Sequence, residues 1–170
     1  LSQTIINDAE AAIIDKYISV FVHEQTDNLP YGFSRSEMIS KLTSTISTID
    51  AYLNDNSDTR TIYVSAYEEG GTGYIDEIGK TIIDEWIALF NANSTYKDNV
   101  IIKQLIDLEP NATRSEAMTF TDETVYQNYY KRLLKDALIV GKANHVFKTH
   151  SMLPTIGQIQ SNNQNQTYLI

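Results

Sequence analysis

Thr61-Ile-Tyr-Val-Ser-Ala-Tyr67 is the one segment of this 170-residue chain with a clear β-strand pattern. It is rich in β-branched and aromatic residues, and small or aliphatic side chains alternate with tyrosine and serine along it. A strand must pair with another, and the candidates are short pieces of the C-terminal tail, Thr155 to Gln160 or Thr167 to Ile170, or a strand from another subunit. The sequence therefore predicts a single short β element.

Helical periodicity dominates the rest of the chain. Apolar residues recur at three- and four-residue spacing in residues 3–26, 34–53, 75–90, 100–108 and 122–148. Ser34 and Glu37 form a capping box, which predicts Ser34 as the N-cap of its helix. We therefore expect a mainly α fold, an irregular bundle of about five helices with one short β element.

Two residues of these helices carry specific expectations. Trp86 should be buried, with Ile82 and Leu89 on the same face of its helix. Gly141 lies inside the longest predicted helix, where glycine costs roughly 1 kcal/mol relative to alanine. A kink or a close helix contact is therefore expected at Gly141.

The final twenty residues read SMLPTIGQIQSNNQNQTYLI, which contains no charged residue and no helical period. Such a segment has little apolar surface with which to offset its ordering entropy. We therefore divide the chain into a helical domain, residues 1–150, and an extended C-terminal arm, residues 151–170. Either its own domain or another subunit is expected to hold the arm.

Charge and composition exclude several classes of partner. The net charge of −9 and the isoelectric point near 4.7 argue against nucleic acid as the main ligand. The absence of cysteine excludes disulfides and thiolate metal sites. No apolar run approaches eighteen residues, so no membrane contact is expected. A cytoplasmic location, or one inside a virus or phage particle, is favoured over secretion.

Motifs for catalysis or metal binding fail on spacing. His23-Glu24 lacks the second histidine that a zinc protease helix needs, because position 27 is aspartate. His145 and His150 are five residues apart, on different faces of a helix. The Gly71-Thr-Gly73 loop lacks the spacing of phosphate-binding loops. We therefore predict no catalytic residue, no metal and no cofactor, and a protein that is not an enzyme.

Eleven tyrosines are an excess for this length, and tyrosine is enriched at protein interfaces. The predicted interaction residues are Tyr63, Tyr67, Tyr126, Tyr130, Tyr168, Leu169 and Ile170. The expected function is a structural or assembly subunit that contacts other protein subunits, copies of itself first. Connector and accessory proteins of virus and phage particles are the architectural analogy. Two alternatives remain open: an acidic regulatory module that occupies a basic site, and an enzyme whose site joins residues remote in sequence.

Overall fold

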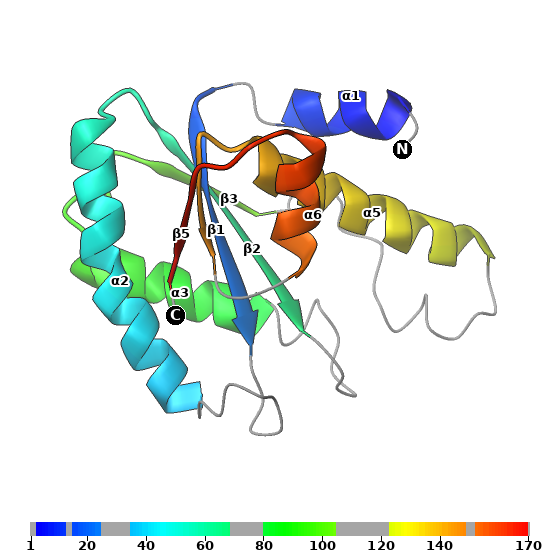
Figure 1. Cartoon of the computed structure of the whole chain (residues 1–170). Coiled ribbons are helices and arrows are strands. Elements are labelled where there is room, and N and C mark those ends of the chain that lie inside the picture. Colours follow the sequence, from blue (N-terminus) through cyan, green and yellow to red (C-terminus); the bar gives the residue numbers. More distant parts are fainter. Residues whose placement is uncertain are drawn as a thin grey trace.

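A five-stranded parallel sheet forms the centre of the protein in the computed structural model, which describes residues 3–12, 15–24, 35–68, 80–104, 123–148 and 152–169. The strand order is β3-β2-β1-β4-β5 (Figure 1). The strands are β1 Tyr17–Glu24, β2 Thr61–Glu68, β3 Ile101–Gln104, β4 His145–Lys148 and β5 Gln166–Tyr168. The helices are α1 Gln3–Ala12, α2 Arg35–Asp55, α3 Lys80–Asn93, α5 Glu123–Lys142 and α6 Met152–Gln160. The fold is therefore α/β. The expected mainly α bundle is wrong, and so is the assignment of the chain to the all-α class.

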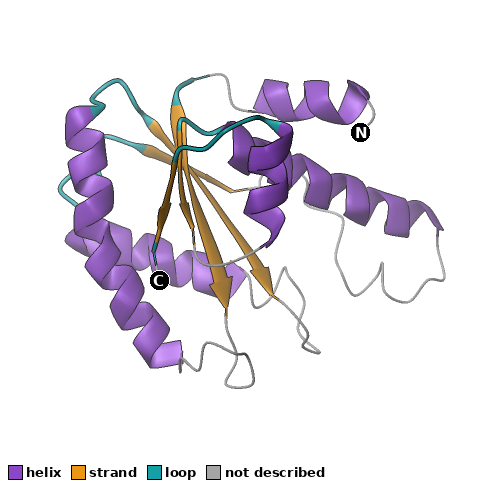
Figure 2. Cartoon of the chain, viewed as in Figure 1, coloured by secondary structure: helices purple, strands orange, loops and turns teal. Residues whose placement is uncertain are grey.

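Helices cover both faces of this sheet (Figure 2). On one face, α2 and α3 pack against the side chains of β1 and β2 in a core that includes Ile18, Val64 and Trp86. On the other face, α5 contributes Ile139 and its neighbours to a second core with Phe21. The helix α6 packs on α5 and so belongs to that second layer.

Because helices cover both faces of the sheet, the sequence pattern of β1 wrongly predicts part of a helix. All six side chains from Tyr17 to Val22 are buried, so the strand shows no alternation of apolar and polar residues. Within the segment 3–26, for which one helix is expected, Gln3–Ala12 form α1 and Tyr17–Glu24 form β1. The same error affects 101–104 and 145–148, which are strands β3 and β4. Strands of four residues are too short to display a period.

Other expectations are confirmed. Residues 61–67 lie in β2, and α2 covers residues 35–53 of the predicted helix 34–53. The predicted N-cap, Ser34, lies outside the described residues. Trp86 is fully buried on α3 and stacks on Phe90, with 5.3 Å between the ring centroids. Leu89 packs against the same core, and the side chain of Ile82 lies outside the described set.

The close contact expected at Gly141 is present, and its partner is Gly157 on α6. A Cβ on Gly141 would lie 2.1 Å from the carbonyl carbon and oxygen of Gly157. A Cβ on Gly157 would lie 1.7 Å from the carbonyl oxygen of Ala137. The backbones of α5 and α6 therefore touch, and only glycine permits this approach.

The C-terminal segment is part of the sheet architecture, so the expected extended arm is wrong. It forms α6 and then β5, which pairs in parallel with β4. Leu169 is 8% exposed and joins the core under α2 and α3. The Asn- and Gln-rich turn is held by backbone and side-chain hydrogen bonds, among them Asn163 Nδ2 to the carbonyls of Gly141 and Ala143, both at 2.7 Å. An uncharged side-chain amide thus satisfies backbone carbonyl groups at the C-terminal end of α5.

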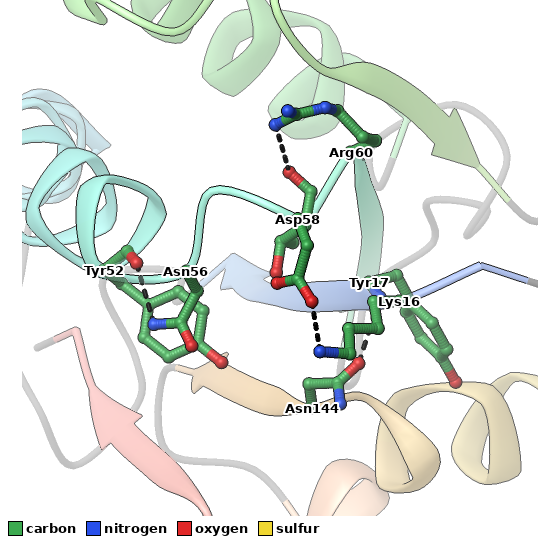
Figure 3. Close-up of polar contacts among 8 residues, drawn as sticks. Lys16, Tyr17, Tyr52, Asn56, Asp58, Arg60 and Asn144 are labelled. Atoms are coloured by element: carbon green, nitrogen blue, oxygen red, sulfur yellow. Dashed lines mark hydrogen bonds and ion pairs between the residues drawn. The ribbon is translucent and has the colours of Figure 1, made fainter.

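The amino edge of the sheet is closed by polar contacts between the segments that enter the strands (Figure 3). The Lys16 ammonium pairs with the Asp58 carboxylate, and this contact lowers the pKa of Asp58. The Tyr17 amide donates to Asn144 Oδ1 at 3.1 Å, which ties β1 to the turn before β4. Both pairs are structural, since they link strand entries.

Because His145 is partly buried, we expect the stability of the protein to depend on pH. Its Nε2 lies 2.9 Å from Thr167 Oγ1, and its ring centroid lies 4.9 Å from Tyr52 and 4.7 Å from Phe147, so no charged group faces it among the residues described. Burial lowers the pKa of His145, so the unfolded chain takes up a proton at a higher pH than the folded protein. The free energy of unfolding should therefore fall as the pH drops from about 7 to about 5.

Urea unfolding at both pH values, for the native chain and for His145→Phe, measures this effect. The phenyl ring keeps the stacking but cannot titrate, so the variant should show a smaller loss on acidification. Equal losses in the two proteins would contradict the assignment to His145.

Candidate functional site

The last residues of the strands lie together at the carboxyl edge of the sheet, and they are polar or charged. All five strands run in the same direction, so their last residues share one edge. Those residues are Glu24, Glu68, Gln104, Lys148 and Tyr168. In β1, β2 and β4 the last residue follows buried residues, whereas β3 and β5 are partly or largely exposed.

The strand order has a reversal at the boundary between β1 and β4. From β1 the chain crosses through α2 to β2 on one face, and from β4 it crosses through α6 to β5 on the other face. In open parallel sheets such diverging connections leave a crevice outside the carboxyl ends of the two strands, where ligands bind. Register pairs Phe21 with Lys148 across this boundary and Glu24 with Glu68 beside it.

Lys148 is the most unusual side chain of the sheet, because it is a buried cation. It is 1% exposed, and its Nζ donates to Gln158 Oε1 at 2.7 Å and to Thr155 Oγ1 at 3.1 Å. The ammonium also lies 5.2 Å from the ring centroid of Tyr168. Lys16–Asp58 is the one ion pair within the described ranges, so no described carboxylate neutralises Lys148. Burial accordingly lowers the pKa of Lys148.

Gln158 on α6 is the nearer of the two hydrogen-bond partners of this cation. Its side chain is 4% exposed, and its Nε2 is buried with no hydrogen-bond partner in the described part of the chain. Gln158 also lines an open hollow of about 470 Å³ between α6 and β5. The other lining residues are Thr155, Ile159, Asn162, Asn163, Gln164 and Gln166.

Tyr63, predicted as an interaction residue, is fully buried in the core under α5. Its hydroxyl donates to Asp136 Oδ1 at 2.6 Å. The hydroxyls of Ser19 and Ser65 are buried nearby along the same face, without a partner among the residues described. Tyr63 is therefore inaccessible to a partner protein in this structure.

Two of the remaining predicted interaction residues are exposed. Tyr130 on α5 and Tyr168 on β5 are 41% and 49% exposed. Leu169 is buried on the face of the sheet opposite Tyr63. The side chains of Tyr67 and Tyr126 lie outside the described residues, as does Ile170.

The sequence reasoning missed Lys148, Thr155 and Gln158. Lys148 is the last residue of the predicted helix 122–148, and Thr155 and Gln158 fall in the predicted arm 151–170. The one available signal was the position of the lysine directly after the buried pair Val146-Phe147, which is how a polar residue ends a buried strand.

The expectation of no metal and no cofactor stays a prediction. Among the described side chains, no group of three or more histidine, aspartate and glutamate residues could hold a metal ion. Within the same ranges, no helix is both long and apolar enough to cross a membrane.

Comparison with known proteins gives no relative: no protein-family model, no curated protein and no solved structure matches this chain.

Proposed function

We propose that this chain is a ligand-binding α/β domain that holds a small polar molecule at the carboxyl edge of its sheet, where β1 meets β4. The observation that carries the proposal is the reversal of strand order at this boundary, with the crossovers from β1 and β4 on opposite faces. The α/β topology supports this function better than the purely structural role that the sequence predicts.

The residues at the strand ends define the chemistry of the ligand. Glu24 and Glu68 are register partners at the ends of β1 and β2, and His23 pairs in the same way with Tyr67. Carboxylates accept hydrogen bonds and repel anions. The ligand is therefore a polar molecule with hydrogen-bond donors, such as hydroxyl or amino groups.

Thermal-shift screening of small polar molecules, followed by backbone NMR titration with each hit, tests the proposal. A hit should shift the amides at the ends of β1, β2 and β4. Glu24→Gln or Glu68→Gln should weaken its binding roughly tenfold or more, as expected for loss of a hydrogen bond to a charged group. Asp58→Asn, a matched change at the amino edge, should leave binding unchanged. Hits that shift only amides elsewhere, or that ignore both glutamate variants, would overturn the proposal.

Assembly with copies of itself is a second candidate, supported by the exposed apolar residues of the C-terminal segment. Ile156 and Ile159 on α6 are 43% and 72% exposed, and Ile159 lines the hollow that Gln166 of the edge strand β5 also lines. Residues 151–170 carry no charge in a chain of net charge −9. Two such chains repel each other, so an uncharged surface is where they can meet without burying like charges.

The mass of the protein in solution tests this second candidate. The native chain should form dimers or larger species, and Ile159→Asp should return it to a monomer. Ser47→Asp, the same charge on the exposed side of α2, should leave the mass unchanged. A native chain that stays monomeric at its highest soluble concentration would refute self-assembly.

A further inference from the structure

Strand β5 is the last strand at one edge of the sheet, and no strand in the described part of the chain lies beyond it (Figure 1). Its ladder to β4 uses the carbonyl of Asn165, which accepts from Val146 at 2.9 Å, and the amide of Leu169, which donates to Lys148 at 2.8 Å. Backbone groups alternate in direction along a strand, so the N–H and C=O of Gln166 point away from β4. Gln166 is exposed, and an edge of this kind is a template for pairing with another strand.

The surface beside this edge is unusually apolar. Within the described ranges, five large apolar side chains are exposed, and three of them lie on α6 and β5: Ile156, Ile159 and Tyr168, at 43%, 72% and 49%. Ile159 and Gln166 also line the same hollow of about 470 Å³. Single exposed apolar residues are normal, but three on two neighbouring elements, beside a hollow, indicate a surface that another chain covers.

The opposite edge of the sheet is less suited to pairing. Strand β3 exposes Ile101, but it also contains Lys103, and proteins use lysine on edge strands to prevent pairing. Residues 151–170, which include α6 and β5, carry no charge in a chain of net charge −9. Two copies of the chain can therefore meet at β5 without bringing like charges together.

We propose that two copies of this chain join through their β5 strands, antiparallel and related by a two-fold axis at Gln166, so that their sheets become continuous. This inference rests on the second candidate function, self-assembly, and specifies its interface. At the axis, the Gln166 N–H of each copy donates to the Gln166 C=O of the other. Gln166 is the register partner of Val146, so both side chains lie on the α5–α6 side of the sheet, where their amides pair across the axis.

The register also accounts for the exposed tyrosine. With Gln166 on the axis, Tyr168 of one copy lies opposite Gln164 of the other. Gln164 lines the hollow together with Ile159, so the second copy places an aromatic ring beside this apolar side chain. The same surface is used by both copies, so the contact closes on itself and the assembly stops at a dimer.

Cysteine cross-linking tests this register, because the native chain contains no cysteine. Opposed residues of a hydrogen-bonded antiparallel pair have Cα atoms about 5.5 Å apart, a separation that a disulfide bridges. Gln166→Cys should therefore form a disulfide-linked dimer under mild oxidation. Ser47→Cys, exposed on α2, and Ile101→Cys, on the opposite edge strand, should not cross-link.

Substitution of Gln166 by proline or alanine separates the backbone contact from the side-chain contact. Gln166→Pro removes the outward N–H and none of the bonds to β4, whereas Gln166→Ala keeps that N–H. Proline should weaken dimerisation roughly tenfold or more, because two hydrogen bonds are lost per dimer, and alanine should weaken it less. The mass of each variant in solution over a concentration series measures both effects.

The outcomes separate this interface from self-assembly in general. If the native chain dimerises but Gln166→Cys does not cross-link, or if Gln166→Pro dimerises as well as Gln166→Ala, the β5 pairing is wrong and self-assembly stands. If the native chain stays monomeric, both are wrong. Cross-linking of Ile101→Cys in preference to Gln166→Cys would move the interface to β3 and overturn the proposal.

Discussion

Gly157→Ala should destabilise the protein by about 3 kcal/mol, at the upper end of the usual cost of overpacking. The added methyl group would lie 1.7 Å from the carbonyl oxygen of Ala137, which is backbone and cannot rotate away. Relief requires α6 to move off α5. That movement would also disturb the contacts of Thr155 and Gln158 with Lys148.

Urea denaturation measures this cost, with Gln160→Ala as the matched control. Gln160 lies on the same helix but is exposed, so its truncation should change the free energy of unfolding by no more than about 0.5 kcal/mol. Similar midpoints for Gly157→Ala and Gln160→Ala would show that α6 does not press on α5 in solution.

Trp86→Ala should cost on the order of 3–5 kcal/mol, because it empties the largest fully buried side chain of the core under α2 and α3. The ring stacks on Phe90, so the substitution removes an aromatic contact together with the buried area. Thermal or urea unfolding gives the value directly.

Trp86→Phe is the informative companion. The indole Nε1 is buried and has no hydrogen-bond partner in the described ranges, so phenylalanine removes an unsatisfied donor along with some volume. Its cost should be clearly smaller than that of Trp86→Ala. Equal losses would mean that the indole N–H is satisfied in solution or that the cavity cannot relax at all.

Part of the fold was predictable from the sequence, and the reason differs between elements. Helices α2 and α3 have one buried face, so their apolar residues repeat at helical spacing. Strand β2 was recognised from its β-branched and aromatic composition. Strand β1 was missed because Tyr17, Val20 and Phe21 also fit helical spacing when both strand faces are buried.

The C-terminal elements were beyond the reach of such patterns. Strands β4 and β5 have four and three residues, and α6 contains a proline and a glycine. Gly157 counts against a helix by propensity, yet the contact with α5 requires it. Tertiary packing determines whether these segments form strands or a helix, and amino-acid composition alone does not predict that packing.

The candidate sites were even less visible in the sequence. The ends of five separate strands meet at the carboxyl edge only because the strands are parallel. The Lys148–Gln158 contact joins residues ten positions apart, across a change from strand to helix. Without the strand assignment, Lys148 looks like any surface lysine.

The unequal lengths of the strands have a consequence for how the chain acquires its structure. β1 and β2 pair over eight residues each, whereas the ladders to β3, β4 and β5 span four, four and three. The β1–α2–β2 unit also leaves the ribosome before the β4 and β5 segments exist. This unit is therefore the natural nucleus for folding, and its central amides should be the last to exchange with solvent. The outer strands then complete a sheet whose middle is already formed.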